Sequence, residues 1–469
     1  MSTKSMPSGK APVLHSLPSW ITAQQCFAAV RSMPLPVLLA SGTSTHNAAR
    51  FDIITGDPAV ILRTREQETL VTLKHSNQII RESGSPFAVL EKYCPLDQQK
   101  FAVSDELPFT GGAIGYFGYE LMHATNHIDH SDKSGISLPD MLIGVYHWAV
   151  VIDHSNQQNW LVVREQAEEQ TDALLELFSA ASAHAATSGE SGASPFKLTT
   201  PFKSNFTNDE YQQRFHRIID YIHAGDCYQV NLAECFSAAC SGDSWSAFVH
   251  LQEFANAPFA AYMEDGEQAV LSFSPERFLR VSNLEVLTQP IKGTRPRSSD
   301  PQQDAANRRD LETSKKDRAE NLMIVDLLRN DLGRVCAFGS VSVENLFETQ
   351  SFTNVHHLVS TIKGRLNKAC DVFSLLAASF PGGSITGTPK QRAMEIINEL
   401  ETMPRSVYCG AIAWIDFSGN MDSNICIRTL VKDQGSIHCW GGGGIVADSQ
   451  GADEYQETLD KISMLINNL

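Results

Sequence analysis

The first half of the chain alternates short apolar runs with turns, a pattern typical of strands in an antiparallel sheet. Apolar runs at residues 36–40, 51–54 and 60–62 are separated by turn-forming residues such as Gly56-Asp57-Pro58. Residues 108–119 alternate glycine with aromatic side chains. This predicts a strand that another segment of the chain crosses closely.

A hairpin and a helix are predicted before the composition changes. Residues 141–152 and 159–163 have the apolar character of a hairpin pair, and residues 171–184 have that of a helix. Residues 181–195 are rich in Ala, Ser and Gly, which is typical of a linker. The chain is therefore divided into an N-terminal region, a linker and a catalytic region, at residues 1–180, 181–204 and 205–469.

Helical and strand patterns also follow one another in the second half. Thr207 and Glu210 form a capping-box pattern at the start of a helix that ends at Gly225. In the next strand, Gln229 and Asn231 share one face. The strand-like runs are residues 227–232, 259–263, 269–273, 278–281, 341–343, 356–360, 411–415, 425–431 and 437–440.

Three further helices are predicted towards the C-terminus. One covers residues 313–331, another has Thr388 as its N-cap and Pro389 as its first residue, and the last begins near Ala452. Strands outnumber helices in both halves, which favours an α+β layered sandwich over a Rossmann or TIM fold. The apolar stripe of the first of these helices is expected to face the core: Leu322, Val325, Leu328 and Leu332.

Composition and charge exclude several classes of partner. The chain has 469 residues and a formal net charge of −17, so its field repels nucleic acid and anionic membranes. Its ten cysteines form no CxxC pair, which is typical of reduced thiols in a cytosolic protein. No apolar run is long enough for a secretory signal or a membrane span. We therefore expect a cytoplasmic protein in which any anionic substrate needs local cations or a metal.

Two groups of residues are candidates for chemistry. Lys292 lies between an apolar strand end and a glycine, downstream of Glu276; a surface lysine in a turn is the alternative. Glu320 lies on one helix and Glu454 and Glu457 on another, and carboxylates from different helices often hold Mg²⁺. A solvated acidic helix face remains the alternative for these carboxylates.

Glycine-rich segments offer backbone N–H groups to an anion. They are the run Gly441 to Gly444 and the turn at Gly387-Thr388, although each equally fits a tight strand connection. Lys390 and Arg428 would supply positive charge to such a pocket. His357 lies in an apolar run, where a buried structural histidine is the alternative to a catalyst.

Seven motifs in order together resemble the chorismate-utilising enzymes. The resemblance implies the large layered α/β/β/α sandwich of the anthranilate synthase component I type. It covers about residues 205–465 strongly and the N-terminal region through shorter segments. The motifs are Ser274-Pro275-Glu276-Arg277-Phe278, Pro290-Ile291-Lys292-Gly293-Thr294, Asp317-Arg318-Ala319-Glu320-Asn321, Leu327-Leu328-Arg329-Asn330-Asp331-Leu332, His357-Leu358-Val359-Ser360, Gly387-Thr388-Pro389-Lys390 and the segment around Glu454 and Glu457.

Two positions indicate the branch of this family. Gln229 stands where the water-adding branches carry a lysine, and Lys292 stands where the anthranilate branch carries alanine. The resemblance therefore implies the branch that aminates chorismate at C4 on the route to p-aminobenzoate and folate. The anthranilate branch is the alternative, and a catalytically silent homologue is a third hypothesis.

The resemblance also implies roles for individual residues. Glu276 matches the acid that protonates the departing C4 hydroxyl, with Lys292 as a nucleophile or an orienting cation and His357 as a further catalytic residue. Glu320 and Glu457, with Glu454 beside them, match the Mg²⁺ ligands. The substrate-binding residues implied are Gln229, Thr294, Thr388, Lys390, Tyr408, Arg428, Gly441, Gly442 and Gly443.

Partners follow from the same resemblance. Chorismate and ammonia are the substrates, and a separate glutamine amidotransferase subunit is expected to supply the ammonia because no glutaminase signature is visible in the chain. Ser41, Pro258 and Phe259 match a tryptophan pocket. Ala40 departs from the family pattern there, because a glutamate usually precedes that serine.

Overall fold

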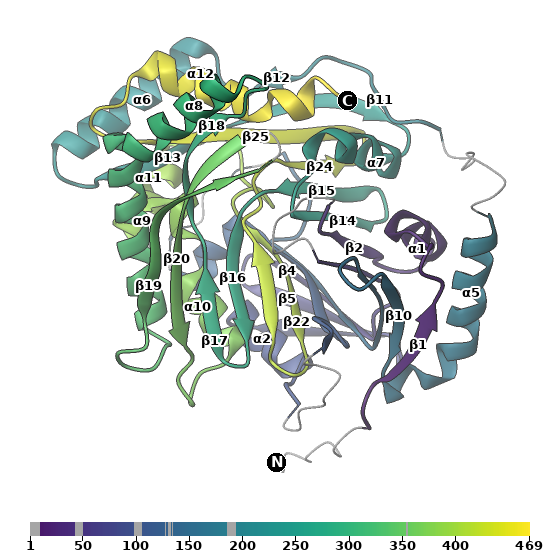
Figure 1. Ribbon diagram of the computed structural model, residues 1–469. Helices are drawn as coiled ribbons and strands as arrows, with labels where there is room; N and C mark the ends of the chain where they lie inside the picture. The colour runs from purple at the N-terminus through teal and green to yellow at the C-terminus, as the bar shows by residue number, and fades with distance from the viewer. Residues whose placement is uncertain are drawn as a thin grey trace.

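Two large antiparallel sheets pack face to face, and helices cover their outer faces (Figure 1). The computed structural model describes residues 10–42, 50–97, 106–126, 128–129, 133, 135–184, 194–352 and 355–469. The larger apolar core joins residues of both sheets, and a second core lies between the first sheet and helices of the N-terminal and catalytic regions. The predicted α+β sandwich is therefore confirmed.

The first sheet has 13 strands and draws them from both halves of the chain. Pairing of β2 with β14 brings the N-terminal region against the catalytic region. In order, its strands are β1 (Val13–Leu17), β10 (Gln158–Val163), β9 (Trp148–Asp153), β3 (Phe51–Thr55), β2 (Val37–Ala40), β14 (Phe259–Asp265), β15 (Gln268–Ser274), β24 (Thr429–Asp433), β25 (Ser436–Ile445), β13 (Gln229–Ser241) and β11 (Lys197–Leu198), with β12 (Lys203–Ser204) and β21 (Gly387–Thr388) also paired to β13.

The second sheet has 12 strands and is interleaved in the same way. A Cβ on Gly115 of β7 would lie 2.0 Å from the carbonyl oxygen of Leu142, so the predicted close crossing is confirmed. In order, its strands are β18 (Ile291–Pro296), β20 (Val355–Arg365), β17 (Glu285–Thr288), β16 (Arg277–Ser282), β23 (Met421–Asn424), β22 (Ala411–Asp416), β7 (Gly112–Phe117), β8 (Met141–Tyr146), β4 (Val60–Arg65), β5 (Glu68–Leu73) and β6 (Gln78–Ser83), with β19 (Ser342–Ser351) paired to β20.

The two regions of the sequence are therefore not separate bodies in space, because strands of both run through both sheets. Residues 185–193 of the predicted linker lie outside the described residues, and its remaining residues include the end of α5 and the short strands β11 and β12. The predicted hairpin is wrong in one respect: residues 141–152 belong to β8 in the second sheet and β9 in the first, and only β9 and β10 form a hairpin. Both strands are buried, so the apolar run gives no sign of the change of sheet.

Helices pack on both outer faces, with α12 and α7 against the first sheet and α9, α8 and α2 against the second. None of them, within the described ranges, is long and apolar enough to cross a membrane. Their bounds are α1 (Ala23–Val30), α2 (Pro86–Tyr93), α4 (Met122–Thr125), α5 (Thr171–His184), α6 (Asn208–His223), α7 (Ser244–Ala255), α8 (Pro301–Thr313), α9 (Lys315–Gly333), α10 (Val372–Ser379), α11 (Lys390–Leu400) and α12 (Gly451–Ile466), with 3₁₀ turns η1 (Tyr119–Leu121), η2 (Glu165–Gln170) and η3 (Gly383–Ile385).

Helix starts test the capping patterns. The capping box of Thr207 and Glu210 before α6 is confirmed. The prediction that Thr388 caps a helix is wrong by one residue. Thr388 lies in β21 and pairs with Gln229 of β13 in the first sheet. Pro389 is the N-cap of α11.

The apolar stripe of α9 differs from the prediction at one position. Leu322 is 45% exposed, whereas Val325 and Leu328 are buried. The buried face of the helix includes Asn321, a polar residue that an apolar pattern does not count. Asn321 accepts a hydrogen bond from Ser360 Oγ of β20 at 2.5 Å, so the side of α9 that carries Asn321 faces β20.

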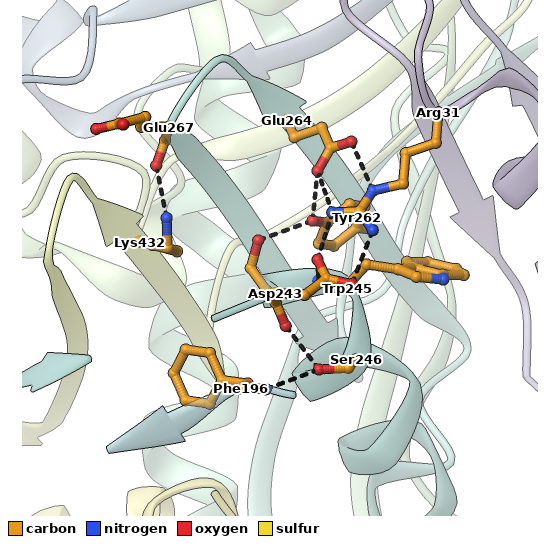
Figure 2. A network of polar contacts seen from close by, with 10 residues as sticks. Arg31, Phe196, Asp243, Trp245, Ser246, Tyr262, Glu264, Glu267 and Lys432 are labelled. Atoms are coloured by element: carbon orange, nitrogen blue, oxygen red, sulfur yellow. Dashed lines mark hydrogen bonds and ion pairs between the residues drawn. The ribbon is translucent and has the colours of Figure 1, made fainter. Parts of the chain in front are cut away.

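An ionic network ties the N-terminal region to the catalytic region (Figure 2). Arg31, which follows α1, donates from Nε to Glu264 of β14 at 2.8 Å and from Nη1 to Asp243 at 2.8 Å. Asp243 also caps α7 by accepting from the Trp245 N–H, and Tyr262 donates its hydroxyl to Glu264 at 2.8 Å. Each charge in the network faces an opposite charge, so the network can be held without a ligand.

Candidate active site

Lys292 lies at a bulge in β18. The register between β18 and β20 shifts between Ile291 and Thr294, and Gly293 has a φ of 85°. A Cβ on Gly293 would lie 2.8 Å from side-chain atoms at the packing helices, so only glycine fits there. Bulges re-aim side chains out of a ladder. The Lys292 Nζ donates a hydrogen bond to the carbonyl oxygen of Ser384 at 3.2 Å.

Glu276 lies in the turn between β15 and β16 and is 6% exposed. Its Oε1 accepts a hydrogen bond from Ser384 Oγ at 2.9 Å. Burial raises the pKa of Glu276 to about 7, although Lys292 and the Ser384 hydroxyl favour its charged form. A carboxyl group with such a pKa is suited to donate a proton near neutral pH. The structure thus joins the predicted acid and the predicted amine to the same residue.

Two of the predicted metal ligands, Glu320 and Glu454, lie close to the same lysine, Lys316. Lys316 Nζ lies 4.0 Å from Glu320 Oε1 and 3.6 Å from Glu454 Oε1. Burial raises the pKa of Glu320, although Lys292 and Lys316 oppose this effect. Glu454 is buried and also accepts a hydrogen bond from a serine hydroxyl at 2.7 Å. A bound cation would relieve this crowding of carboxylates.

Glu457 lies one turn after Glu454 on α12 and is more exposed, with 52% of its side chain accessible. Partial burial would raise its pKa, but Lys461 at 2.7 Å, with Lys316 and Lys292, holds the pKa below its usual value. No three ligating side chains of the described residues are already grouped to hold a metal. Carboxylate oxygens are the donors that Mg²⁺ prefers. The ammonium groups of Lys316 and Lys461 pair with these carboxylates.

The glycine run of β25 lies against these carboxylates. A Cβ on Gly443 would lie 3.0 Å from Glu454 Oε2, and one on Gly444 would lie 2.4 Å from Gln229 Nε2. Lys461 Nζ donates to the carbonyl oxygen of Gly442 at 2.9 Å. Glycine is needed at position 444 because the Gln229 amide approaches the backbone too closely for a Cβ, and at position 443 a Cβ would crowd the Glu454 carboxylate.

Within the described residues, Gln229 has an amide without a hydrogen-bond partner and Arg428 has a charge without a carboxylate partner. Gln229 has no exposed surface, and neither its amide nitrogen nor its amide oxygen has a hydrogen-bond partner among the described residues. Arg428 forms no ion pair with any carboxylate in the described part of the chain, and burial lowers its pKa. Its φ of 50° lies in the left-handed region, which is uncommon for a residue with a side chain. These groups fit an anionic, polar ligand.

The predicted catalytic residue His357 and two predicted substrate-binding residues, Thr294 and Tyr408, have internal partners. Thr294 and His357 are opposite each other on β18 and β20, with Thr294 Oγ1 2.9 Å from His357 Nδ1. The Tyr408 ring stacks on Trp440 at 6.0 Å between centroids. Such contacts fix these side chains in place.

Lys390 and Thr388 line an open groove of about 840 Å³ beside α9 and α11. The Lys390 ammonium donates to Asp331 at 2.6 Å and to the carbonyl oxygen of Ser379 at 2.9 Å. Its charge is therefore balanced within the protein. A role in substrate binding stays a prediction for both groove residues.

The residues predicted for a tryptophan pocket come together in a cavity of about 320 Å³ between the sheets, lined by Ser41, Pro258 and Phe259. Ser41 donates from its N–H and from its hydroxyl to Asp52 Oδ1, at 2.7 and 3.0 Å. Asp52 on β3 thus places a carboxylate beside Ser41, although Ala40 carries none.

Three residues of the site were missed from the sequence: Ser384, Lys316 and Lys461. Ser384 lies in the 3₁₀ turn η3, to which the sequence assigns no function. A serine between two glycines and an isoleucine was the only local signal. Lys461 lies four residues after Glu457, so helical spacing could have indicated this pair.

Comparison with known proteins defines the family. The sequence profile of the chorismate binding enzymes matches residues 53–467, so the chain belongs to that family. It is 44% identical to aminodeoxychorismate synthase component 1 of Klebsiella aerogenes over 464 residues, covering 98% of this chain and 99% of that protein. It is also 44% identical to the protein of the same name from Escherichia coli (strain K12), covering 95% of this chain and 96% of that one.

A solved structure shares the fold. Anthranilate synthase component I from Streptococcus pneumoniae TIGR4 superposes with a TM-score of 0.78 at 30% identity, covering 89% of this chain and 92% of that one. The sandwich type predicted from the sequence is therefore confirmed by a relative as well as by the strand order.

Proposed function

We propose that this chain is the chorismate-aminating component of an aminodeoxychorismate synthase, which converts chorismate and ammonia to 4-amino-4-deoxychorismate on the route to p-aminobenzoate and folate. The near-full-length similarity to two proteins of that name supports it. The observation that carries the proposal is the pair formed by Glu276 and Lys292, an acid and an amine that bind the same serine.

Glu276 supplies the proton for the leaving group. Hydroxide is a poor leaving group, so the C4 hydroxyl of chorismate must be protonated as its C–O bond breaks. A buried carboxyl with a pKa of about 7 holds that proton at neutral pH and can still release it. The hydroxyl then departs as water.

Lys292 acts as the nucleophile in this proposal. Its neutral amine forms a bond to C2, the two conjugated ring double bonds shift to C1=C6 and C4=C5, and the C4 hydroxyl leaves with the proton of Glu276. Ammonia then forms a bond to C4, both double bonds return, and the C2–N bond breaks to free Lys292. A proton from the new ammonium group restores Glu276, so the net reaction consumes chorismate and ammonia and yields the amine and water. In the alternative, Lys292 only orients the substrate and ammonia attacks directly.

Mg²⁺ is the proposed cofactor, held by Glu320 and Glu457 with Glu454 beside them. When bound, it would neutralise a substrate carboxylate in an otherwise acidic protein. On the protein side, Arg428 binds an anionic group of the substrate, because its charge has no partner within the described residues. The resemblance assigns Tyr408 and the amides of Gly441 to Gly443 to substrate binding as well, and Gln229 offers an amide without a partner among the described residues.

A separate glutamine amidotransferase subunit is proposed as the ammonia source, since the relatives are named component 1, which implies a second subunit. The isolated chain should use ammonium at alkaline pH and not glutamine. We also propose that tryptophan occupies the cavity at Ser41, which mass spectrometry of the denatured protein would detect. Glutamine-dependent turnover without a partner would contradict the first of these two proposals.

Identification of the product tests the function. The protein is incubated with chorismate, Mg²⁺ and ammonium, and the products are separated and weighed by mass spectrometry. We expect 4-amino-4-deoxychorismate with its pyruvyl group intact. Fluorescent anthranilate with release of pyruvate would favour the anthranilate alternative, and recovery of unchanged chorismate would favour the silent homologue.

A further inference from the structure

We propose that Ser384 is a positioning residue that ties Glu276 to Lys292, and that its hydroxyl favours the charged form of Glu276. The inference rests on the proposed function. Ser384 uses both of its polar groups inside the site: its hydroxyl donates to Glu276 Oε1 at 2.9 Å and its carbonyl oxygen accepts from Lys292 Nζ at 3.2 Å. One residue thereby sets the separation of the acid and the amine.

The turn that carries Ser384 is held firmly in place. Arg405 is 1% exposed and donates to the carbonyl oxygen of Ile385 at 3.0 Å and to that of Asn231 on β13 at 2.7 Å. Glu401 balances its charge by accepting two hydrogen bonds, at 2.8 and 2.6 Å. Arg405 thus links the turn that carries Ser384 to β13.

Close packing restrains the same turn from the other side. A Cβ on Gly382 would lie 2.6 Å from Ile425 Cδ1, and one on Gly383 would lie 2.5 Å from Leu327 Cδ2. The two glycines let the turn sit against these side chains. Ser384 is therefore the first residue of the turn with a polar side chain that can reach Glu276.

The electrostatic role follows from what else faces Glu276. Burial favours the neutral acid, whereas Lys292 from β18, the Ser384 hydroxyl, the Ile291 N–H and Lys461 from α12 favour the carboxylate. The buried thiol of Cys409 also faces it. A hydroxyl that donates to a carboxylate stabilises the charged form. If the Ser384 hydroxyl is removed, one of the groups that stabilise the carboxylate is lost, so the pKa of Glu276 rises further above its usual value.

Loss of the Ser384 hydroxyl should change the pH dependence of turnover in one direction. Glu276 must be protonated to act as the acid, so turnover falls as pH rises through its pKa. Without the hydroxyl, this fall moves to higher pH. For Ser384→Ala we expect a shift of about one pH unit, the scale of one charge-assisted hydrogen bond. We also expect kcat to fall by about 10-fold or more, with the KM for chorismate within about twofold, because the serine aligns the reacting groups.

The test compares Ser384→Ala and Ser384→Thr with the wild type, in assays at a fixed concentration of free ammonia across the pH range. Thr349→Val is the matched control, because it removes a buried hydroxyl that has no partner in the described structure. Ser384→Thr keeps the hydroxyl and should restore the wild-type pH profile. A carbonyl infrared titration of Glu276, identified by its absence in Glu276→Gln, reports the same pKa without turnover.

Each outcome is decisive. The inference holds if the alanine variant shifts both the pH profile and the infrared titration upward while the threonine and Thr349→Val variants do not. It is overturned if the alanine variant titrates like the wild type, or if only its KM changes. Absence of amination by the wild type would refute the proposed function, whereas the infrared titration would still test the contact with Glu276.

Discussion

The Arg31 network and the active site use the same kinds of residue in opposite ways. Arg31 meets two carboxylates, and each of these has a further role in capping a helix or binding a tyrosine (Figure 2). Arg428 has no carboxylate partner in the described ranges, and Gln229 has an unsatisfied amide. Charges that are satisfied internally hold the two regions together, whereas those left unsatisfied are available to a ligand.

The largest expected effect is at Lys292. Lys292→Ala should lower the amination rate by about 10³-fold or more, the scale seen when a catalytic group that acts with its neighbours is removed. Lys292→Arg should not restore the rate, because a guanidinium keeps the charge and stays protonated. Steady-state amination assays at saturating ammonium measure both variants.

Withholding ammonia sharpens the same prediction. If Lys292 is the nucleophile, chorismate should accumulate as an adduct on the peptide that contains it, visible by mass spectrometry. Near-native activity of the arginine variant together with no adduct would assign Lys292 to orienting the substrate.

Glu276→Gln should lower turnover by about 10²- to 10⁴-fold, the usual contribution of a general acid. The wild type should lose activity as pH rises through about 7 when free ammonia is held constant, because the protonated carboxyl is the active form. The glutamine variant should lack this limb of the profile. An unchanged limb in the variant would assign the titration to another group.

The carboxylates on α9 and α12 come next. Glu320→Gln and Glu457→Gln should weaken Mg²⁺ binding by more than the roughly 10- to 100-fold that loss of an outer-shell partner costs. Titration with Mg²⁺, followed by calorimetry and by activity, measures this. Glu312→Gln on α8, which changes an exposed carboxylate paired with Arg308, is the control. Equal Mg²⁺ affinity in all three variants would place Glu320 and Glu457 on a solvated face.

The smallest effect on catalysis, and the largest on stability, should come from the Arg31 network. Arg31→Ala leaves Asp243 and Glu264 unpaired and should lower the free energy of unfolding by about 3 kcal/mol. Arg81→Ala breaks an exposed pair with Glu68 and should cost less than about 1 kcal/mol. Denaturant melts compare the two. Equal losses would mean that burial of the network contributes nothing to the fold.

The sequence was informative where the signal is local. Apolar runs located β2, β3 and β4, and the capping box located the start of α6. It was silent where partners are distant in the chain: Ser384 and Glu276 are 108 residues apart, and Arg31 and Glu264 are 233 apart. The motifs named Lys292 and Glu276 individually, but only the fold shows which residue connects them.

Local patterns also failed where a polar residue or a change of sheet was buried. Asn321 turned the face of α9 and left Leu322 exposed. The continuous apolar run from β8 to β9 concealed a passage between sheets. Both errors arise because burial depends on neighbours that the local sequence does not contain.

Chorismate binding to Arg428→Gln tests the central claim most directly. The dissociation constant is measured by calorimetry with Mg²⁺ present, in a Lys292→Ala background so that no turnover occurs. Loss of the unpaired guanidinium should raise the dissociation constant by about 10-fold or more, the scale of a hydrogen bond to a charged group. In the same background, Arg31→Ala should leave it within about twofold. An unchanged dissociation constant for Arg428→Gln, or an equal rise for Arg31→Ala, would contradict the account. It would mean that the charge paired within the protein and the charge without a carboxylate partner do not differ in substrate binding.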